Sequence, residues 1–383
     1  MRRTLFTRDH EAYRDSVREF IAREVTPHYD DWEENRLVDR SAWLAAGKMG
    51  IIGLAVPEQF GGAGELDYRY RYIVAEEIAR SATTSFGAGL GLHDDIVIPY
   101  IADLGTDEQK QRWLPGMAAG EIICAIAMTE PGTGSDLQGI KTTAVRDGDH
   151  WILNGQKTFI TSGIHADIVI VAARTDPSAG SRGFSLLVVE RGMEGFTRGR
   201  KLHKVGLAAQ DTAELSFDNV RVPAGNLLGT EGGGLIHLME RLPRERLSIA
   251  VSAICVARAA YEWTKAYAFD RSAFGKPIGD FQNTRFALAE MLTEIDVTQA
   301  YVDNAVLAIN DGELSAVEAA QAKWWASELQ KRVVDRCVQL HGGYGYMMEY
   351  PIGRAYVDSR IQTIYGGTTE IMKEIIGRDI AKN

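Results

Sequence analysis

The spacing of apolar residues changes twice along this 383-residue chain, and these changes constrain its fold more than any other feature. Up to about residue 120, apolar side chains recur every three or four residues, as at Val17, Phe20 and Ile21, which is typical of amphipathic helices. Residues 121–230 instead hold short apolar runs separated by turn residues, which is typical of strands. From residue 231 the helical spacing returns in longer segments, near 233–269, 281–310, 315–340 and 368–380.

This order predicts an α+β fold with three domains. We expect an N-terminal helical domain over residues 1–120, a middle β domain over 121–230 and a C-terminal helical bundle over 231–383. The middle domain should be a barrel or sandwich with strands near 122–128, 151–153, 158–161, 168–172, 184–189 and 213–217. Asn154-Gly155 between two of these runs is a strong hairpin signal.

Charge and cysteine usage exclude several classes of function. The net charge of −10 argues against a nucleic-acid surface, because phosphate binding needs clustered cations, although a local basic patch for one anionic ligand remains compatible. The three cysteines lie far apart and the eight histidines form no HExxH pattern, so we expect neither a disulfide framework nor a metal site. No run of about 18 apolar residues predicts a membrane span, and the first residues lack the apolar core of a secretory signal. A cytoplasmic location is therefore expected in a bacterium, whereas a eukaryotic protein would be expected to carry a mitochondrial presequence.

The string Met128-Thr-Glu-Pro-Gly-Thr-Gly-Ser-Asp136 directly follows the first predicted strand of the middle domain. Its glycines permit close backbone approach to a ligand, and successive N–H groups in such a turn can bind an anion. A plain strand-to-loop connection would account for a Gly-rich turn equally well. The whole string, however, resembles the signature of the acyl-CoA dehydrogenase family. The resemblance extends over essentially the whole chain and is greatest to the long-chain type of that family, at segments 242–247 and 364–368.

The resemblance implies a helical domain, a β domain and a C-terminal four-helix bundle, assembled as a homotetramer. It implies oxidation of the Cα–Cβ bond of a fatty acyl-CoA to a trans-2-enoyl-CoA, as in fatty acid β-oxidation. The cofactor would be flavin adenine dinucleotide (FAD), and electrons would pass to electron-transfer flavoprotein. Two other functions stay open on the same fold: a flavin monooxygenase or nitroalkane oxidase, and a catalytically silent FAD-binding scaffold.

The resemblance also assigns cofactor contacts, in four groups. They are Ile126, Met128, Thr129, Ser135, Phe159, Thr161 and Ser162 around the flavin; Arg271, Phe274 and Gln282 toward the FAD of a neighbouring subunit; Gln339, Leu340, His341, Gly342 and Gly343 on the diphosphate and adenine side; and Thr368 and Glu370 at the start of the last helix, whose N-terminus suits a phosphate. Phe159 stands where the family often has tryptophan, and it could instead be an aromatic residue of the β-domain core. Arg271 could instead be a solvated surface charge, and the segment 341–343 also fits a helix C-cap.

The catalytic base is where this chain departs from the commoner family pattern. Many members have glutamate where Gly366 stands, and glycine cannot accept a proton. A minority place the glutamate on a C-terminal-domain helix, just before an arginine, and Glu245-Arg246 matches that position. The resemblance gives Gly366 a different part, in which its backbone N–H binds the thioester oxygen. Ser135, Arg246, Gly366 and Gly367 are the substrate-binding residues that it implies.

Helix geometry agrees with Glu245 as the base. Glu240 lies five residues earlier, about 140° around the helix, so the two carboxylates cannot point into one site. The residues that share the face of Glu245 are the apolar Leu238, Leu242 and Ile249. Desolvation there would raise the pKa of Glu245 toward a value useful in a base, whereas the neighbouring arginines would lower it. A surface glutamate paired with an arginine is the alternative.

Two further sequence features remain to be interpreted. Pro243 lies inside the helix of Glu245 and predicts a kink or break. Gly87, Gly89 and Gly91 crowd into the predicted helix 85–101, although each glycine destabilises a helix by up to about 1 kcal/mol. They indicate either close packing between helices or room for a bulky acyl tail, and chain length and branching of the substrate stay open.

Overall fold

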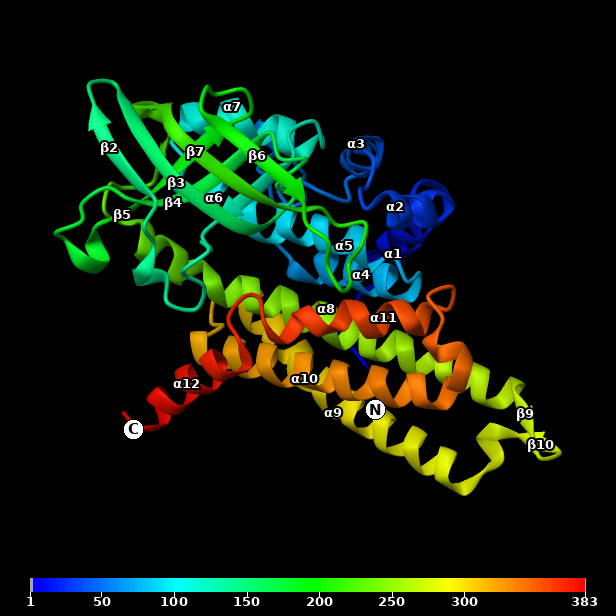
Figure 1. Cartoon of the computed structure of the whole chain (residues 1–383). Helices are drawn as coiled ribbons and strands as arrows, with labels where there is room; N and C mark the ends of the chain where they lie inside the picture. Colours follow the sequence, from blue (N-terminus) through cyan, green and yellow to red (C-terminus); the bar gives the residue numbers. More distant parts are fainter. Residues whose placement is uncertain (1–2, 383) are drawn as a thin grey trace.

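The computed structural model describes residues 3–382 and has the predicted order of helices, strands and helices (Figure 1). The first part of the chain forms the helices α1 (Arg8–Phe20), α2 (Tyr29–Asn35), α3 (Arg40–Lys48), α4 (Tyr68–Arg80), α5 (Thr84–Gly91), α6 (Ile98–Leu104) and α7 (Asp107–Ala118). The predicted helix 85–101 is therefore α5 and α6 joined through the π-helical turn Leu92–Val97. Within residues 3–382, no helix has both the length and the apolar composition that crossing a bilayer requires.

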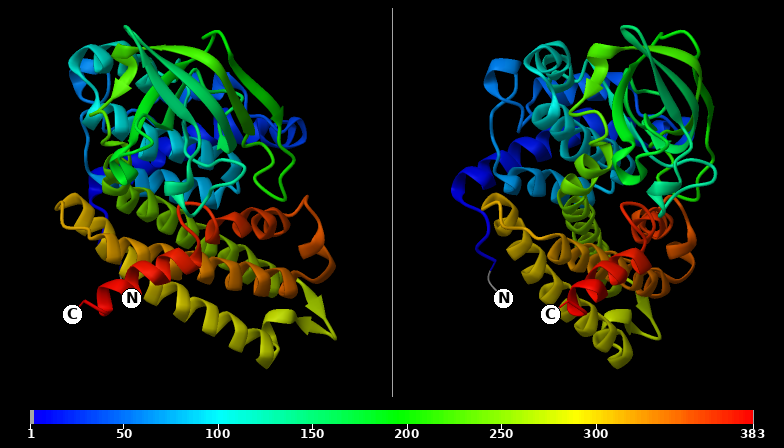
Figure 2. Two further views of the ribbon diagram at one scale, coloured as in Figure 1. Left: turned by 60° about the vertical axis from the view of Figure 1, so that its left-hand side comes forward. Right: turned by 90° about the vertical axis from the view of Figure 1, so that its left-hand side faces the viewer.

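The middle of the chain forms one sheet of eight strands, which curls back on itself (Figure 2). The strands are β1 (Cys124–Ala127), β2 (Thr143–Asp147), β3 (His150–Thr161), β4 (Ile168–Arg174), β5 (Phe184–Glu190), β6 (Phe196–Lys201), β7 (Thr212–Pro223) and β8 (Leu227–Leu228). Their order is β6-β7-β3-β2-β4-β5-β8, and β1 pairs with β4 in parallel. We did not predict β2 and β6, because at least half of the residues in each are exposed and give no apolar run.

The hairpin predicted at Asn154-Gly155 is wrong. Strand β3 runs without interruption through these residues, and the tight turn lies at Gly148, between β2 and β3. At Gly155 the register between β3 and β7 shifts, and a Cβ there would lie 2.7 Å from the Cα of Thr142. The glycine therefore permits an irregularity in the strand and a close backbone contact instead of a turn.

The C-terminal part is a helical bundle of α8 (Gly234–Asp270), α9 (Gln282–Asn310), α10 (Ala316–His341), α11 (Pro351–Ser359) and α12 (Thr369–Ile380). Two short strands, β9 (Ser272–Ala273) and β10 (Lys276–Pro277), form the turn between α8 and α9. Pro243 does not break α8, which continues past it for 27 further residues to Asp270. The buried Leu238 and Leu247 on either side pack against the domains around them, and such tertiary packing supplies most of the stability of a helix in a protein.

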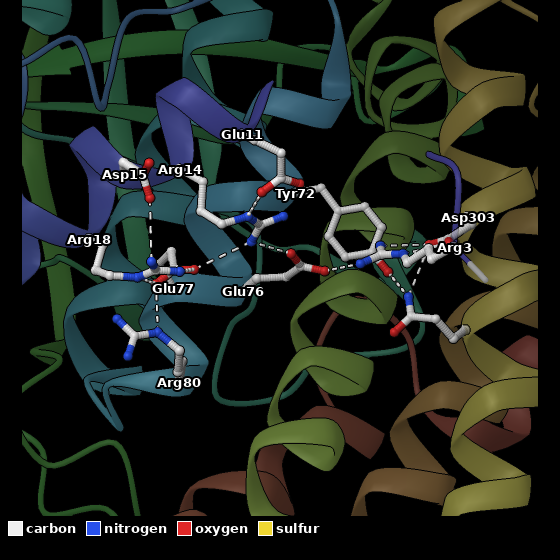
Figure 3. A network of polar contacts seen from close by, with 11 residues as sticks. Arg3, Glu11, Arg14, Asp15, Arg18, Tyr72, Glu76, Glu77, Arg80 and Asp303 are labelled. Atoms are coloured by element: carbon white, nitrogen blue, oxygen red, sulfur yellow. Dashed lines mark hydrogen bonds and ion pairs between the residues drawn. The ribbon is translucent and has the colours of Figure 1, made fainter. Parts of the chain in front are cut away.

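Helix α8 connects the three parts of the molecule, and α4 lies against it. Leu238, near the start of α8, packs in one apolar cluster with strands of the sheet, whereas Leu247 and later residues pack with the bundle and with Tyr72 of α4. A network of ion pairs fixes α4 further (Figure 3). In it Glu77, whose side chain is 3% exposed, accepts from Arg18 of α1 at 3.1 Å and from Arg80 at 2.7 Å.

Candidate active site

Glu245 is buried on α8 at the junction of the three parts. Only 4% of the residue is exposed, and the hydroxyl of Tyr100 on α6 donates to its Oε1 at 2.9 Å. Burial raises the pKa of Glu245 from 4.5 to about 7, although the Tyr100 hydrogen bond and the charges of Arg246 and Arg241 act in the opposite direction. A carboxyl with that pKa is half ionised at neutral pH and is well matched to general-base work. The alternative of a surface glutamate is therefore wrong.

The expected geometry of α8 is confirmed around this residue. Leu238 is 2% exposed on the face of Glu245, whereas the side chain of Glu240 is 60% exposed on another face. Arg246 directs its Nε to the carbonyl oxygen of Gly366 at 3.4 Å, so it connects α8 to the loop before α12.

Gly366 lies in that loop, directly against α8. Its φ is +64°, and a Cβ on it would overlap the Cδ1 of Ile249, one helical turn after Glu245. Its backbone N–H donates no hydrogen bond within residues 3–382, so the loop that packs on Ile249 offers a strong donor without a partner. The carbonyl of the next residue, Gly367, accepts from Lys323 Nζ at 2.6 Å.

Lys323 is a residue that the sequence analysis missed. Residue Lys323 is fully buried, and burial lowers its pKa to about 8, with Arg246 acting in the same direction. Lys323 holds the carbonyl of Gly367 and Arg246 holds the carbonyl of Gly366, and together they fix the loop that presents the Gly366 N–H. Thr368 then caps α12 by accepting from the N–H of Ile371 at 3.3 Å, and Glu370 lies in the first turn of that helix.

A second group of predicted residues meets where β1 ends beside β3. Ile126 is buried on β1, Met128 and Thr129 are half-buried just after it, and Ser135 is exposed further along the turn. The N–H of Thr158 on β3 donates to the Thr129 carbonyl at 2.9 Å, which joins the turn to the strand that contains Phe159, Thr161 and Ser162.

Phe159 and Ser162 both have unusual backbone angles. Their φ values are +60° and +59°, a region that non-glycine residues seldom adopt and that is often kept at functional sites. Phe159 is 69% exposed, so the alternative of a β-domain core aromatic is wrong. Its ring face is available for a planar ligand.

The turn after β1 is held by a buried ion pair that sequence reasoning also missed. Glu130 accepts from the N–H groups of Lys141 and Thr142, at 2.7 and 2.9 Å, and from Lys157 Nζ at 2.9 Å. Lys157 also donates to the carbonyl of Met128 at 3.0 Å. These bonds fix the shape of the 128–136 turn, and no local sequence signal pairs Lys157 with a residue 27 positions earlier.

A third group borders an open cavity of about 520 Å³ at the end of α10. Its lining includes Arg271, Gln339, Leu340, His341, Gly342 and Gly343. Gly342 has a φ of +59° and ends α10, so the segment is a helix C-cap as expected, and a Cβ on Gly343 would meet no atom within 4 Å. A cation beside open glycine backbone is a combination that suits an anionic ligand.

Three family models match almost the whole chain. They describe the N-terminal, middle and C-terminal domains of acyl-CoA dehydrogenase and match residues 7–121, 125–220 and 232–381. The pig protein named long-chain specific acyl-CoA dehydrogenase, mitochondrial, is 52% identical over 99% of this chain and 88% of its own length. The chain belongs to the acyl-CoA dehydrogenase family.

Solved structures agree with this assignment. An acyl-CoA dehydrogenase from Geobacillus kaustophilus has a TM-score of 0.96 at 51% identity, covering 98% of both chains. A glutaryl-CoA dehydrogenase from Mycobacterium smegmatis in complex with FADH2 has a TM-score of 0.92 at 29% identity, covering 99% of this chain and 96% of that one. The predicted fold, enzyme class and flavin cofactor are confirmed, since acyl-CoA dehydrogenases are oxidoreductases that use FAD.

The residues assigned to FAD fit that cofactor chemically but lie in separate parts of one chain. Phe159 offers an exposed ring near the 128–136 turn, and the cavity at Arg271 and Gly343 suits a diphosphate. Phe274, 97% exposed with a φ of +51°, and the exposed Gln282 belong to the α8–α9 turn, outside that cavity. Figures 1 and 2 place this turn at the far end of the bundle, away from the sheet. A single chain therefore does not bring the two parts of the predicted FAD site together.

A narrow cavity lies between α4, α5 and α8, and its first lining residue on α8, Ser248, follows Glu245 by three positions. Along α8 it is lined from Ser248 to Val256, about 4.5 to 16 Å from Glu245 at the helical rise of 1.5 Å per residue. The three glycines of α5, interpreted as sites of close packing or as room for an acyl tail, differ in their surroundings here. Gly87 and Gly89 are packing positions, because a Cβ would collide with Ile78 or with Gln210, whereas a Cβ on Gly91 has no neighbour closer than 3.9 Å.

Proposed function

We propose that this enzyme removes a proton from Cα and a hydride from Cβ of a long-chain acyl-CoA, forming trans-2-enoyl-CoA, with Glu245 as the base. The observation that supports this most is the buried carboxyl of Glu245 within one helical turn of the loop that presents the unpaired N–H of Gly366. One acid–base group and one donor for the developing oxygen charge are the two protein parts that the reaction needs.

The roles of the protein groups follow from their surroundings. Glu245 takes the Cα proton, and its raised pKa gives it more proton affinity than an exposed carboxylate has. The N–H of Gly366 donates to the thioester oxygen, where negative charge develops as the proton leaves. Bound FAD supplies the acceptor for the hydride. Arg246 and Lys323 act as positioning residues, because each donates to a carbonyl of the loop that contains Gly366 and Gly367.

The acyl tail is proposed to enter the cavity beside α8. The wall of this cavity on α8 is about 12 Å long and ends about 16 Å from Glu245, and this reach and the open space at Gly91 both favour long chains over short ones. The identity of 52% to a relative named as long-chain specific supports the same substrate class.

The separation of the FAD residues supports a homotetramer in which each FAD contacts two subunits. Phe274 and Gln282 project from the far end of the bundle, where they could reach a cofactor only in a neighbouring molecule. Size-exclusion chromatography with light scattering tests the assembly, and a monomer with full FAD content would contradict it. Electron-transfer flavoprotein as the acceptor and a cytoplasmic location are further proposals, whereas the pig relative is named as a mitochondrial protein.

The experiment that tests the proposed function is anaerobic mixing of the purified flavoprotein with acyl-CoA thioesters from C4 to C18, including branched ones. Loss of the oxidised flavin absorbance with long chains, and turnover with electron-transfer flavoprotein, are expected. Oxygen uptake without an acyl-CoA would instead indicate a monooxygenase or nitroalkane oxidase. Absence of any spectral change across the panel would indicate a silent FAD-binding scaffold.

A further inference from the structure

A buried cluster of charged side chains borders the cavity beside α8. Arg71 on α4 places its Nε 3.0 Å from Oδ2 of Asp94 and 2.9 Å from Oδ1 of Asp95, and its Nη1 donates to the carbonyl of Ile51 at 2.9 Å. None of Arg71, Asp94 and Asp95 is more than 7% exposed. Ser248 on α8 donates to the other oxygen of Asp95 at 2.8 Å. The cluster thus joins α4, the π-helical turn 92–97 and α8.

This cluster makes one wall of the cavity polar. Tyr68, Arg71, Asp95, Ser248 and Ser252 all line the cavity, together with apolar side chains such as Val74, Ile78, Leu90 and Val256. A tunnel that receives only methylene groups would need no such wall, because every buried polar atom must find a partner there.

One donor of the cluster has no partner. Within residues 3–382, Arg71 donates hydrogen bonds from Nε and Nη1, and its Nη2 donates none. The cavity of about 50 Å³ is large enough for a few water molecules that could satisfy Nη2. A plain acyl chain would displace that water and leave Nη2 without a partner, which weakens binding, whereas a chain with an oxygen at this point would replace the water.

The charges of the cluster favour a neutral oxygen over an ionic one. Arg244 donates from Nε to the backbone carbonyl of Asp95 at 3.2 Å, so a second guanidinium lies near the cluster and the formal charges of the two arginines and two aspartates cancel. A carboxylate on the chain would meet Asp94 and Asp95, and an ammonium would meet both arginines. A hydroxyl can accept from Nη2 and donate to an oxygen of the same wall.

We infer that this enzyme is selective for acyl-CoA thioesters that have a hydroxyl group on the middle of the acyl chain, bound by Arg71 and the Ser248 side of the cavity. Ser248 and Ser252 lie about 4.5 and 10 Å along α8 from Glu245, so the hydroxyl is several carbons beyond Cβ. The inference rests on the proposed function, since the acyl tail occupies this cavity only if the thioester lies at Glu245.

The test compares kcat/KM for hexadecanoyl-CoA with that for a series of isomers that have one hydroxyl at successive mid-chain carbons. The holoenzyme is expected to use at least one isomer better than the plain chain. Arg71→Lys keeps a positive charge between the aspartates and replaces the whole guanidinium, Nη2 included, by one ammonium. It should lower the ratio of hydroxylated to plain kcat/KM by about 2- to 10-fold, the effect of one neutral hydrogen bond. Ser248→Ala provides a second variant with the same expectation if Arg71→Lys does not fold.

Val251→Ala is the matched control, because Val251 lines the same cavity without a polar group. It should change kcat/KM for plain and hydroxylated chains by the same factor. The inference is overturned if the holoenzyme prefers the plain chain to every isomer. It is also overturned if Arg71→Lys and Ser248→Ala change the ratio of hydroxylated to plain kcat/KM no more than Val251→Ala does. If neither plain nor hydroxylated chains reduce the flavin, the proposed function itself fails, and that outcome differs from loss of selectivity alone.

Discussion

Replacement of Glu245 by glutamine separates the catalytic part of this residue from its part in stability. Glutamine keeps the size of the side chain and an oxygen that can accept from Tyr100, so the fold around α8 should persist. It cannot accept the Cα proton. Removal of a general base usually costs a factor of about 10² to 10⁴ in rate, and we expect flavin reduction by a long-chain acyl-CoA to slow by at least that lower factor.

The same substitution should stabilise the protein, and the size of the effect follows from the pKa. The unfolded chain has the ordinary value of 4.5 and the folded protein about 7, a difference of about 2.5. Between these two values the unfolded state loses its proton while the folded state keeps it, so wild-type stability falls as the pH rises. Above pH 7 the loss is complete and amounts to about 3 kcal/mol, at about 1.4 kcal/mol for each pH unit. Glutamine has no such ionisation, so the free energy of unfolding of the variant should increase relative to that of the wild type as the pH rises.

Two measurements check this prediction. Stopped-flow absorbance follows flavin reduction, and thermal unfolding at pH 5 and pH 8 compares the variants. Glu240→Gln is the control, because its carboxylate lies on the same helix with 60% of its side chain exposed, and it should match the wild type in both measurements. Full-rate flavin reduction by Glu245→Gln would remove this residue from the role of base. An unchanged difference in melting temperature between pH 5 and pH 8 would refute the raised pKa.

Three further predictions concern the surroundings of the base. In the wild type, kcat/KM should rise with pH through about pH 7 as Glu245 ionises. Tyr100→Phe removes a donor to the carboxylate and should move this rise to about one pH unit higher, so an unmoved profile would contradict the role of Tyr100. Gly366→Ala should destabilise the protein by about 1–2 kcal/mol and slow flavin reduction, because the position has a φ of +64° and its Cβ would overlap Ile249. Gly377→Ala in α12 is the control and should be neutral or stabilising, so equal melting temperatures for the two variants would count against the close contact at Gly366. Gly91→Leu should reduce kcat/KM for C16 thioesters more than for C8 thioesters by filling the cavity beside α8, and an equal reduction for both lengths would show that the tail does not pass this point.

Local spacing was sufficient to predict the long elements but not the short or exposed ones. Helices α8, α9 and α10 lie within two residues of their predicted positions, because a periodic apolar face continues over many turns. Strands β2 and β6 were missed because their exposed side chains contribute little apolar signal. The Asn154-Gly155 prediction failed because a glycine can permit either a turn or a close contact, and only Thr142 on the neighbouring chain segment distinguishes the two.

The candidate site shows the same division. Glycine at position 366 cannot be a base, and the face that Glu245 shares with Leu238 depends only on the 100° step between helical residues. Both conclusions were therefore accessible from the order of residues alone. The hydroxyl of Tyr100, 145 positions away, and the burial that raises the pKa of Glu245 were not. The sequence also does not show that Lys157 donates to Glu130, that Lys323 donates to the carbonyl of Gly367, or that Nη2 of Arg71 has no hydrogen-bond partner within residues 3–382. Periodicity and backbone permissiveness are local properties and are written in the order of residues, whereas desolvation and hydrogen-bond partnership depend on which distant segments meet, and only the folded chain decides that.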